Sequence, residues 1–99
     1  MRVSNMTSDR GNTVANQFLI KNVTVKIGRK NYTGTMFQSY NSLIAFRTNE
    51  GDMFLDEYYW DYSRTTSKYL RQFTGKYKAE TVALIDAGVY KLADLNKGA

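Results

Sequence analysis

The 99-residue chain contains no cysteine and no histidine. The absence of cysteine excludes disulfides, thiol catalysis and thiolate metal sites, and the absence of histidine excludes imidazole ligands. It also removes the side chain that most often transfers protons near neutral pH. Any catalysis would depend on carboxylates, lysine, tyrosine or hydroxyls, so we expect a protein that is not an enzyme and that uses no metal or cofactor.

Long apolar runs are also absent. No segment approaches the length needed to cross a bilayer, and residues 1–6 lack the apolar core of a signal peptide. These features favour a cytoplasmic protein without a membrane partner. The hydrophobic fraction of 42% and the aromatic fraction of 14% are nevertheless too high for a disordered chain. We therefore expect one folded domain over residues 1–99.

The net charge of +5 is unevenly distributed. Residues 1–48 hold seven basic residues and one acidic residue, a charge of +6. Residues 49–61 hold five acidic residues and no basic one (−5), and residues 62–99 hold seven basic and three acidic residues (+4). Such a chain is compatible with nucleic acid or an acidic protein surface as partner, and equally with ordinary solubility.

Alternating β-forming residues predict an antiparallel sheet in the N-terminal two-thirds of the chain. Residues 1–16 are polar and without periodicity, so we expect an N-terminal arm there. A phase change at Lys21-Asn22 indicates a bulge in the first strand. Residues 89–92 are expected to add an edge strand or a docking tail. The four main strands are predicted over residues 17–27, 32–37, 43–48 and 53–59.

The last of these strands, over residues 53–59, is mainly apolar on both faces. A strand of this kind needs cover on both sides. We expect helices to cover one face, and the N-terminal arm or the second subunit of a homodimer to cover the other.

A change from a two-residue to a 3.6-residue period predicts two helices after the strands. In the first, Asp61 or Ser63 can cap the first turn and Gly75 can end the helix. Its apolar face is formed by Thr66, Tyr69, Leu70 and Phe73. The second helix is predicted over residues 78–87, with Ala79, Val82 and Ile85 facing inward and Gly88 ending it. The predicted fold is α+β, a small antiparallel sheet of about four to five strands with two C-terminal helices packed on it.

Three basic residues, Arg64, Lys68 and Arg71, lie opposite the apolar face of the first helix. They follow the i, i+4, i+7 spacing that aligns side chains along a helix. A helix packed on a sheet must expose one face, so a plain solvated surface is one interpretation. The other is a phosphate-binding stripe.

Three neutralised phosphates would give a salt slope of only about −2.7. Tight binding would therefore need further cations from Lys76, Lys78 and the turn at Arg29-Lys30.

Two further groups near this helix could take part in chemistry. Thr65, Thr66 and Ser67 could form an anion site at the helix N-terminus, or could simply cap it. Asp56 and Glu57 point to opposite faces of the predicted strand and cannot converge on one metal ion, so we interpret them as strand-surface charges.

The segment from 55 to 75 is also rich in aromatic residues, with the only tryptophan and four of the eight tyrosines. Burial of Tyr58, Tyr59, Trp60 and Tyr62 together is difficult in an alternating strand, so one or two rings are expected on the surface beside the basic residues.

Three sequence blocks resemble a family of small uncharacterised bacteriophage proteins. They are Asn-Gln-Phe-Leu-Ile at 16–20, Phe-Gln-Ser-Tyr-Asn-Ser-Leu-Ile-Ala-Phe at 37–46, and Leu-Asp-Glu-Tyr-Tyr-Trp-Asp-Tyr-Ser-Arg-Thr-Thr-Ser-Lys-Tyr at 55–69. The resemblance covers most of the chain. It implies a phage origin and a location in the cytoplasm of an infected bacterial host, and it implies no particular activity.

The sequence therefore favours a non-catalytic phage accessory protein that binds nucleic acid or a nucleoprotein complex. An anti-defence inhibitor that blocks a bacterial immune effector, as anti-CRISPR proteins do, is the alternative, and a virion or assembly component is the third interpretation. The candidate binding residues are Arg64, Thr65, Ser67, Lys68, Arg71, Lys76, Lys78, Tyr59, Tyr62, Arg29 and Lys30.

Overall fold

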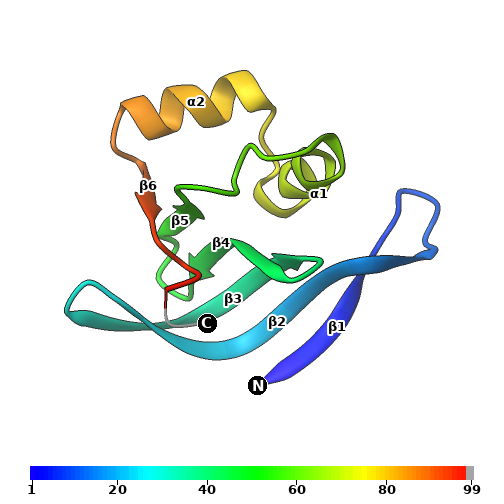
Figure 1. Ribbon diagram of the computed structural model, residues 1–99, viewed down its shortest axis with the longest axis horizontal. Coiled ribbons are helices and arrows are strands. Elements are labelled where there is room, and N and C mark those ends of the chain that lie inside the picture. The colour runs from blue at the N-terminus through cyan, green and yellow to red at the C-terminus, as the bar shows by residue number, and fades with distance from the viewer. Residues whose placement is uncertain (98–99) are drawn as a thin grey trace.

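Six strands and two helices build an α+β fold in a computed structural model that describes residues 1–97 (Figure 1). Residues 98 and 99 of the predicted domain lie outside the described residues. The elements in chain order are β1 (Arg2–Thr7), β2 (Thr13–Ile27), β3 (Lys30–Ser39), β4 (Ser42–Thr48), β5 (Met53–Asp56), α1 (Arg64–Thr74), α2 (Lys78–Asp86) and β6 (Tyr90–Ala93).

The strands form one sheet in the order β1-β2-β3-β4-β5-β6. The first five strands are antiparallel neighbours, whereas β6 pairs with β5 in parallel. The predicted α+β class is confirmed, and so is the edge strand near residues 89–92. The predicted sheet of about four to five antiparallel strands differs from the observed one, which has six strands and one parallel pair. A parallel pair needs a long crossover, and here residues 57–89, with both helices, supply it.

The predicted N-terminal arm is instead a regular strand. β1 pairs with β2 along its length, and the Ser8 N–H donates to the Asn12 carbonyl (2.8 Å) in the connecting loop. Of the β1 side chains only Met6 is buried, at the edge of the core. An edge strand with one buried side chain has no apolar alternation, which explains why the sequence pattern did not predict it.

The predicted bulge is confirmed. The β2–β3 register shifts between Ile20 and Val23, and Asn22 adopts a left-handed φ of 56°. Opposite the bulge, Gly34 has no space for a side chain, because a Cβ there would collide with the Arg47 carbonyl oxygen and lie 2.8 Å from Thr48 Cα. Bulges increase the twist and bend the strand that carries them. The β2–β3 hairpin is accordingly long and curved in Figure 1.

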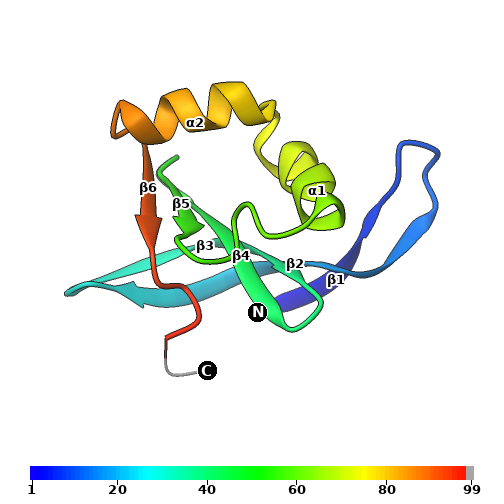
Figure 2. The same cartoon turned by 45° about the horizontal axis from the view of Figure 1, so that its top comes forward.

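Both helices lie over the same face of the sheet (Figure 2). As predicted, Tyr69, Leu70 and Phe73 of α1 are buried, in the core cluster that contains Phe37 and Leu55. Gly75 ends the helix with a left-handed φ of 75°, also as predicted.

Two side chains fix the ends of α1. The Ser63 hydroxyl accepts from the Thr66 N–H (3.1 Å), so Ser63 rather than Asp61 is the N-cap. Arg47 Nη1 of β4 donates to the Phe73 carbonyl (2.8 Å), and its guanidinium lies 4.5 Å from the Phe73 ring centroid. A cation at this end complements the helix dipole.

β5 is shorter than the strand predicted over 53–59 and ends at Asp56. The Asp56 carboxylate accepts from the N–H groups of Tyr58 (3.1 Å) and Tyr59 (2.9 Å), which turns the chain away from the sheet. The interpretation of Asp56 as a surface charge was wrong, since its exposed fraction is 1%. Glu57, in contrast, is exposed.

The second face of β5 is covered by other residues of the same chain. Phe54 packs with Met36, Phe46 and Leu95 in a separate hydrophobic cluster. The centroid of the Tyr32 ring lies 5.0 Å from that of the Phe54 ring. Cover by the N-terminal arm was therefore a wrong prediction, because β1 lies at the opposite edge of the sheet. Formation of a homodimer stays a prediction.

α2 packs against the core through one of its three predicted inward residues, Ile85. Thr81 is its buried residue, whereas Ala79 and Val82 are exposed. The apolar residues of this short helix are spread around its circumference, so the pattern does not define one inward face. No helix within residues 1–97 is long and apolar enough to cross a membrane.

Gln17 gives the fold its first testable prediction. Its side chain is fully buried, and neither amide atom has a hydrogen-bond partner among the described residues. A buried unpaired polar group costs about 1–3 kcal/mol. We expect Gln17→Met, which keeps the length of the side chain, to raise the free energy of unfolding by about 1–2 kcal/mol in urea titrations.

Gln38→Met is the matched control, because Gln38 Nε2 donates to the Tyr40 carbonyl (2.7 Å). Gln38→Met should not raise the free energy of unfolding. A loss of stability in Gln17→Met would show that the amide is satisfied in solution.

Candidate binding groove

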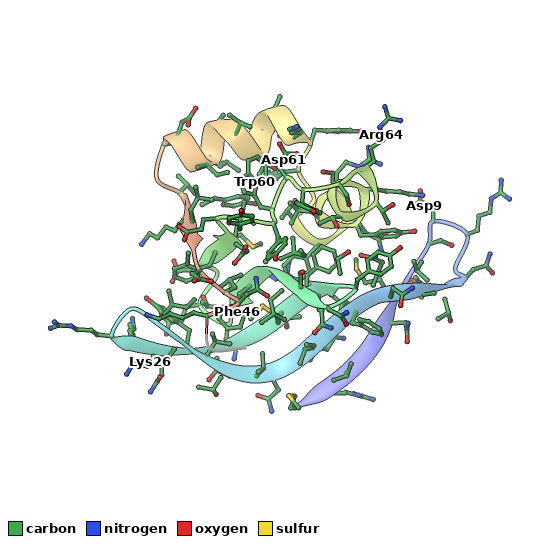
Figure 3. All side chains as sticks on the ribbon, viewed as in Figure 1. Asp9, Lys26, Phe46, Trp60, Asp61 and Arg64 are labelled. Carbon is green, nitrogen blue, oxygen red and sulfur yellow. The ribbon has the colours of Figure 1, made fainter. Side chains whose placement is uncertain are left out.

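The exposed side of α1 forms one wall of an open groove of about 780 Å³. Residues 61–63, which precede α1, and residues 77–78 at the start of α2 form the rest of the lining. Figure 3 labels Asp61 and Arg64 on the side of the sheet where α1 and α2 lie. The lining residues are Asp61, Tyr62, Ser63, Arg64, Ser67, Lys68, Arg71, Tyr77 and Lys78. We call this surface the basic groove.

The basic groove gathers four cations. Arg64, Lys68 and Arg71 share one face of α1 because of their helical spacing, and all three are exposed. Lys78 adds a fourth charge from the start of α2, and Asp61 is the one acidic residue of the lining. The net charge of the lining is therefore +3. The first turn of α1 also contains no acidic residue.

Neighbouring side chains contact three of the cations. Lys68 Nζ lies 5.4 Å from the Tyr69 ring centroid. The Arg71 guanidinium lies 4.9 Å from the Tyr77 ring centroid, and Lys78 Nζ lies 2.9 Å from Asp61 Oδ2. The Lys78–Asp61 pair is at the surface, where such pairs contribute only about 0–1 kcal/mol. An incoming anion can therefore compete with Asp61 for Lys78.

The hydroxyls at the start of α1 do not act together. Thr66 is buried, and its Oγ1 accepts from the Ser63 hydroxyl (3.0 Å) and lies 3.1 Å from Ser39 Oγ. Ser67 lines the basic groove, while Thr65 is exposed on α1 outside the lining. The structure thus separates the three hydroxyls that the sequence suggested as one anion site.

The remaining candidate residues fall in three places. Lys76 lines a small hollow that adjoins the basic groove and shares four lining residues with it, Asp61, Ser67, Arg71 and Lys78. Tyr59 lies beside the groove, with its ring 5.6 Å from that of Tyr62.

Arg29 and Lys30 lie at the tip of the β2–β3 hairpin, at the far end of the molecule from α1 (Figure 1). Figure 3 labels Lys26 near that tip. The structure does not bring these two residues to the groove.

Tyr77 is a groove residue that the sequence analysis missed. Its side chain is 63% exposed and stacks with Arg71. It lies in the connection between the helices, just after Gly75. The signal available in the sequence was a tyrosine between two lysines, next to a helix with a basic face.

The acidic residues in the described part of the chain do not form a metal site. Within residues 1–97 no group of three or more acidic residues lies close enough together to hold a metal ion. Burial raises the pKa of the Tyr90 phenol, the nearby Arg47 lowers it and Glu80 raises it further, but Tyr90 lies on β6 outside the groove. The absence of catalysis and of a cofactor stays a prediction.

Comparison with known proteins gives one family. Neither a search of curated proteins nor a search of solved structures gave a match. The profile of a family described as "Family of unknown function (DUF8033)" matches residues 1–88. The match contains every residue of the basic groove and ends before β6. The chain belongs to the DUF8033 family of unknown function.

Proposed function

We propose that this protein is a non-catalytic binding protein that engages nucleic acid, alone or in a nucleoprotein complex, through the basic groove. The observation that carries the proposal is the convergence of four cations from α1 and α2 on one open groove with two exposed tyrosines. Cations that track a strand provide most of the affinity of non-specific nucleic-acid binding. Exposed aromatic rings beside them add stacking surfaces.

The dimensions of the groove suit a short stretch of nucleic acid. The α1 wall of the groove runs from Arg64 to Arg71 and is therefore about 12 Å long. One strand of a duplex carries a phosphate for about every 3.4 Å of axis, so a wall of this length meets about three or four phosphates. This number agrees with the four cations of the lining.

The resemblance to bacteriophage proteins supplies the proposed setting. We place this binding activity in the cytoplasm of an infected bacterium, where phage or host nucleic acid is the available partner. The groove needs no cofactor for this role.

A second candidate function has an observation of its own. Tyr58 and Tyr62 are 78% and 70% exposed, and Arg64 follows them in the chain. Tyrosine and arginine are enriched among the residues that dominate protein–protein affinity. This composition favours an anti-defence inhibitor that presents these residues, together with the basic groove, to an acidic patch on a bacterial immune effector.

The salt dependence of binding tests the first proposal. Four phosphate contacts predict that log K falls with log salt with a slope of about −2.8 for a single strand and about −3.6 for a duplex. Lys68→Ala removes one contact and should flatten the slope by about 0.7 to 0.9. Fluorescence anisotropy with labelled oligonucleotides of mixed sequence measures both slopes.

Arg29→Ala is the control for this measurement. It removes an exposed cation at the hairpin tip, away from the groove. The slope should stay at its wild-type value in this variant. An equal change in Arg29→Ala and Lys68→Ala would contradict the groove as the binding surface.

A further inference from the structure

A second hollow opens beside the basic groove, between the turn that joins β3 to β4 and the start of α1. Its volume is about 300 Å³, and we call it the turn pocket. Three tyrosines, Tyr40, Tyr59 and Tyr62, line it. Tyr62 and Ser63 line the basic groove as well, so the two hollows adjoin at these residues.

The polar groups of the turn pocket are hydroxyls. Ser39 and Thr66 line it, and their hydroxyl oxygens lie 3.1 Å apart. Ser42 adds a further hydroxyl from β4. Gln17, with its unpaired buried amide, lies directly across the β2–β3 ladder from Ser39. The pocket thus combines aromatic rings with groups that donate and accept hydrogen bonds, and among the described residues no cation lines it.

The backbone conformation of Tyr40 reduces the stability of the fold. Its φ is 54°, in the left-handed region that costs most residues about 1–2 kcal/mol. The other two non-glycine residues with positive φ in the described chain are asparagines, which tolerate this conformation. Strain of this kind is concentrated at functional sites. Tyr40 is 54% exposed and lines the turn pocket, so a bound molecule could contact it.

We propose that the turn pocket accepts one unstacked base of a single strand whose backbone lies in the basic groove. This inference rests on the proposed function and names its substrate class. A nucleobase has a flat face for the tyrosines and a hydrogen-bonding edge for the hydroxyls. The shared lining at Tyr62 and Ser63 lets one strand reach both hollows. A duplex keeps its bases stacked and would have to extrude one, at a cost in free energy.

The test compares three ligands at about 50 mM salt. They are a labelled single strand of about 12 nucleotides, a duplex of the same length, and a free nucleoside monophosphate as competitor. The pocket variant is Tyr40→Gly, because glycine adopts a left-handed φ without strain and the variant should melt no lower than wild type. Ser42→Leu, which narrows the pocket without changing the turn residue, is a second pocket variant.

We expect Tyr40→Gly and Ser42→Leu to weaken single-strand binding by roughly 5- to 150-fold, the range for loss of one stacked base. Duplex binding should change less than about twofold, since the cations are retained. Asn41→Ala is the matched control, because Asn41 is exposed in the same turn as Tyr40 and lines neither hollow. It should bind both ligands as the wild type does.

Three results would overturn the inference. One is an equal effect, or none, of the pocket variants on single strand and duplex, while Lys68→Ala still weakens both; the proposed function then stands without the base pocket. Another is displacement of the single strand by the free nucleotide at micromolar concentration, which would assign the pocket to free nucleotides. The third is a wild-type protein that binds neither oligonucleotide, in which case the proposed function fails as well.

Discussion

Asp56→Ala is expected to destabilise the protein by about 3–5 kcal/mol. The Asp56 carboxylate accepts three backbone hydrogen bonds, from Tyr58 and Tyr59 on one oxygen and from Leu95 (2.8 Å) on the other. Hydrogen bonds to a charged group contribute about 1.5–3 kcal/mol each, and their loss leaves three N–H groups without an acceptor. Domains of this size are stable by about 5–15 kcal/mol.

Thermal melting checks this expectation. A loss of this size should lower Tm by roughly 12–40 °C, at about 4–8 °C for each kcal/mol. Glu57→Ala is the control, since the adjacent carboxylate is exposed, and surface substitutions of this kind change stability by less than about 0.5 kcal/mol. Equal melting temperatures for the two variants would refute the role of Asp56.

The largest functional effect is expected from reversal of the three α1 cations. The triple variant Arg64→Glu, Lys68→Glu, Arg71→Glu changes the net charge of the groove lining from +3 to −3. Three charge-assisted contacts are lost, each contributing about 1.5 kcal/mol or more, so the affinity for nucleic acid should fall about 1,000-fold or further. All three side chains are exposed, so the fold should persist, and circular dichroism verifies this.

A second triple variant separates the groove from the overall charge. Lys21→Glu, Lys26→Glu, Arg29→Glu changes the net charge of the protein by the same amount on exposed residues of β2 and its hairpin. It should retain most of the affinity of the wild type. Equal losses in both triple variants would mean that long-range attraction, rather than the groove, holds the nucleic acid.

The α1 triple variant also distinguishes the second candidate function. If the surface binds an immune effector, a pull-down from host lysate should lose its captured protein in this variant. Any weak nucleic-acid binding by the wild type should then persist almost unchanged. This combination of results would replace nucleic acid by an acidic protein surface as the partner.

The features that the sequence predicted correctly depend on local interactions. The inward face of α1 follows from the spacing of Tyr69, Leu70 and Phe73, and its two ends follow from Ser63 and Gly75. The bulge at Asn22 is visible as a phase change between neighbouring residues. Each of these signals lies within a few residues of the feature that it predicts.

The features that were missed depend on distant contacts. β-forming residues continue past Asp56, so the pattern extends β5 to residue 59, but the Asp56 carboxylate turns the chain there and also holds Leu95. β1 is an edge strand whose pairing with β2, rather than its own composition, makes it regular.

The candidate site divides in the same way. Helical spacing predicted the α1 wall of the basic groove, residue by residue. The opposite wall, with Tyr77 and Lys78, depends on how the chain returns after Gly75. The separation of Arg29 and Lys30 from the groove depends on the direction in which the β2–β3 hairpin extends, which no local pattern indicates.

The parallel pairing of β6 with β5 has a consequence for the order of assembly. The strands from β1 to β5 are sequential antiparallel neighbours and can form by closing short loops, whereas β6 must wait until the chain of residues 57–89 has folded back. We therefore expect β6 to join last and to open first. Until it joins, β5 presents a free edge of four buried residues, Met53–Asp56, which is the kind of edge on which chains aggregate. We therefore expect the pairing of β6 with β5 to prevent association between this edge and other copies of the chain.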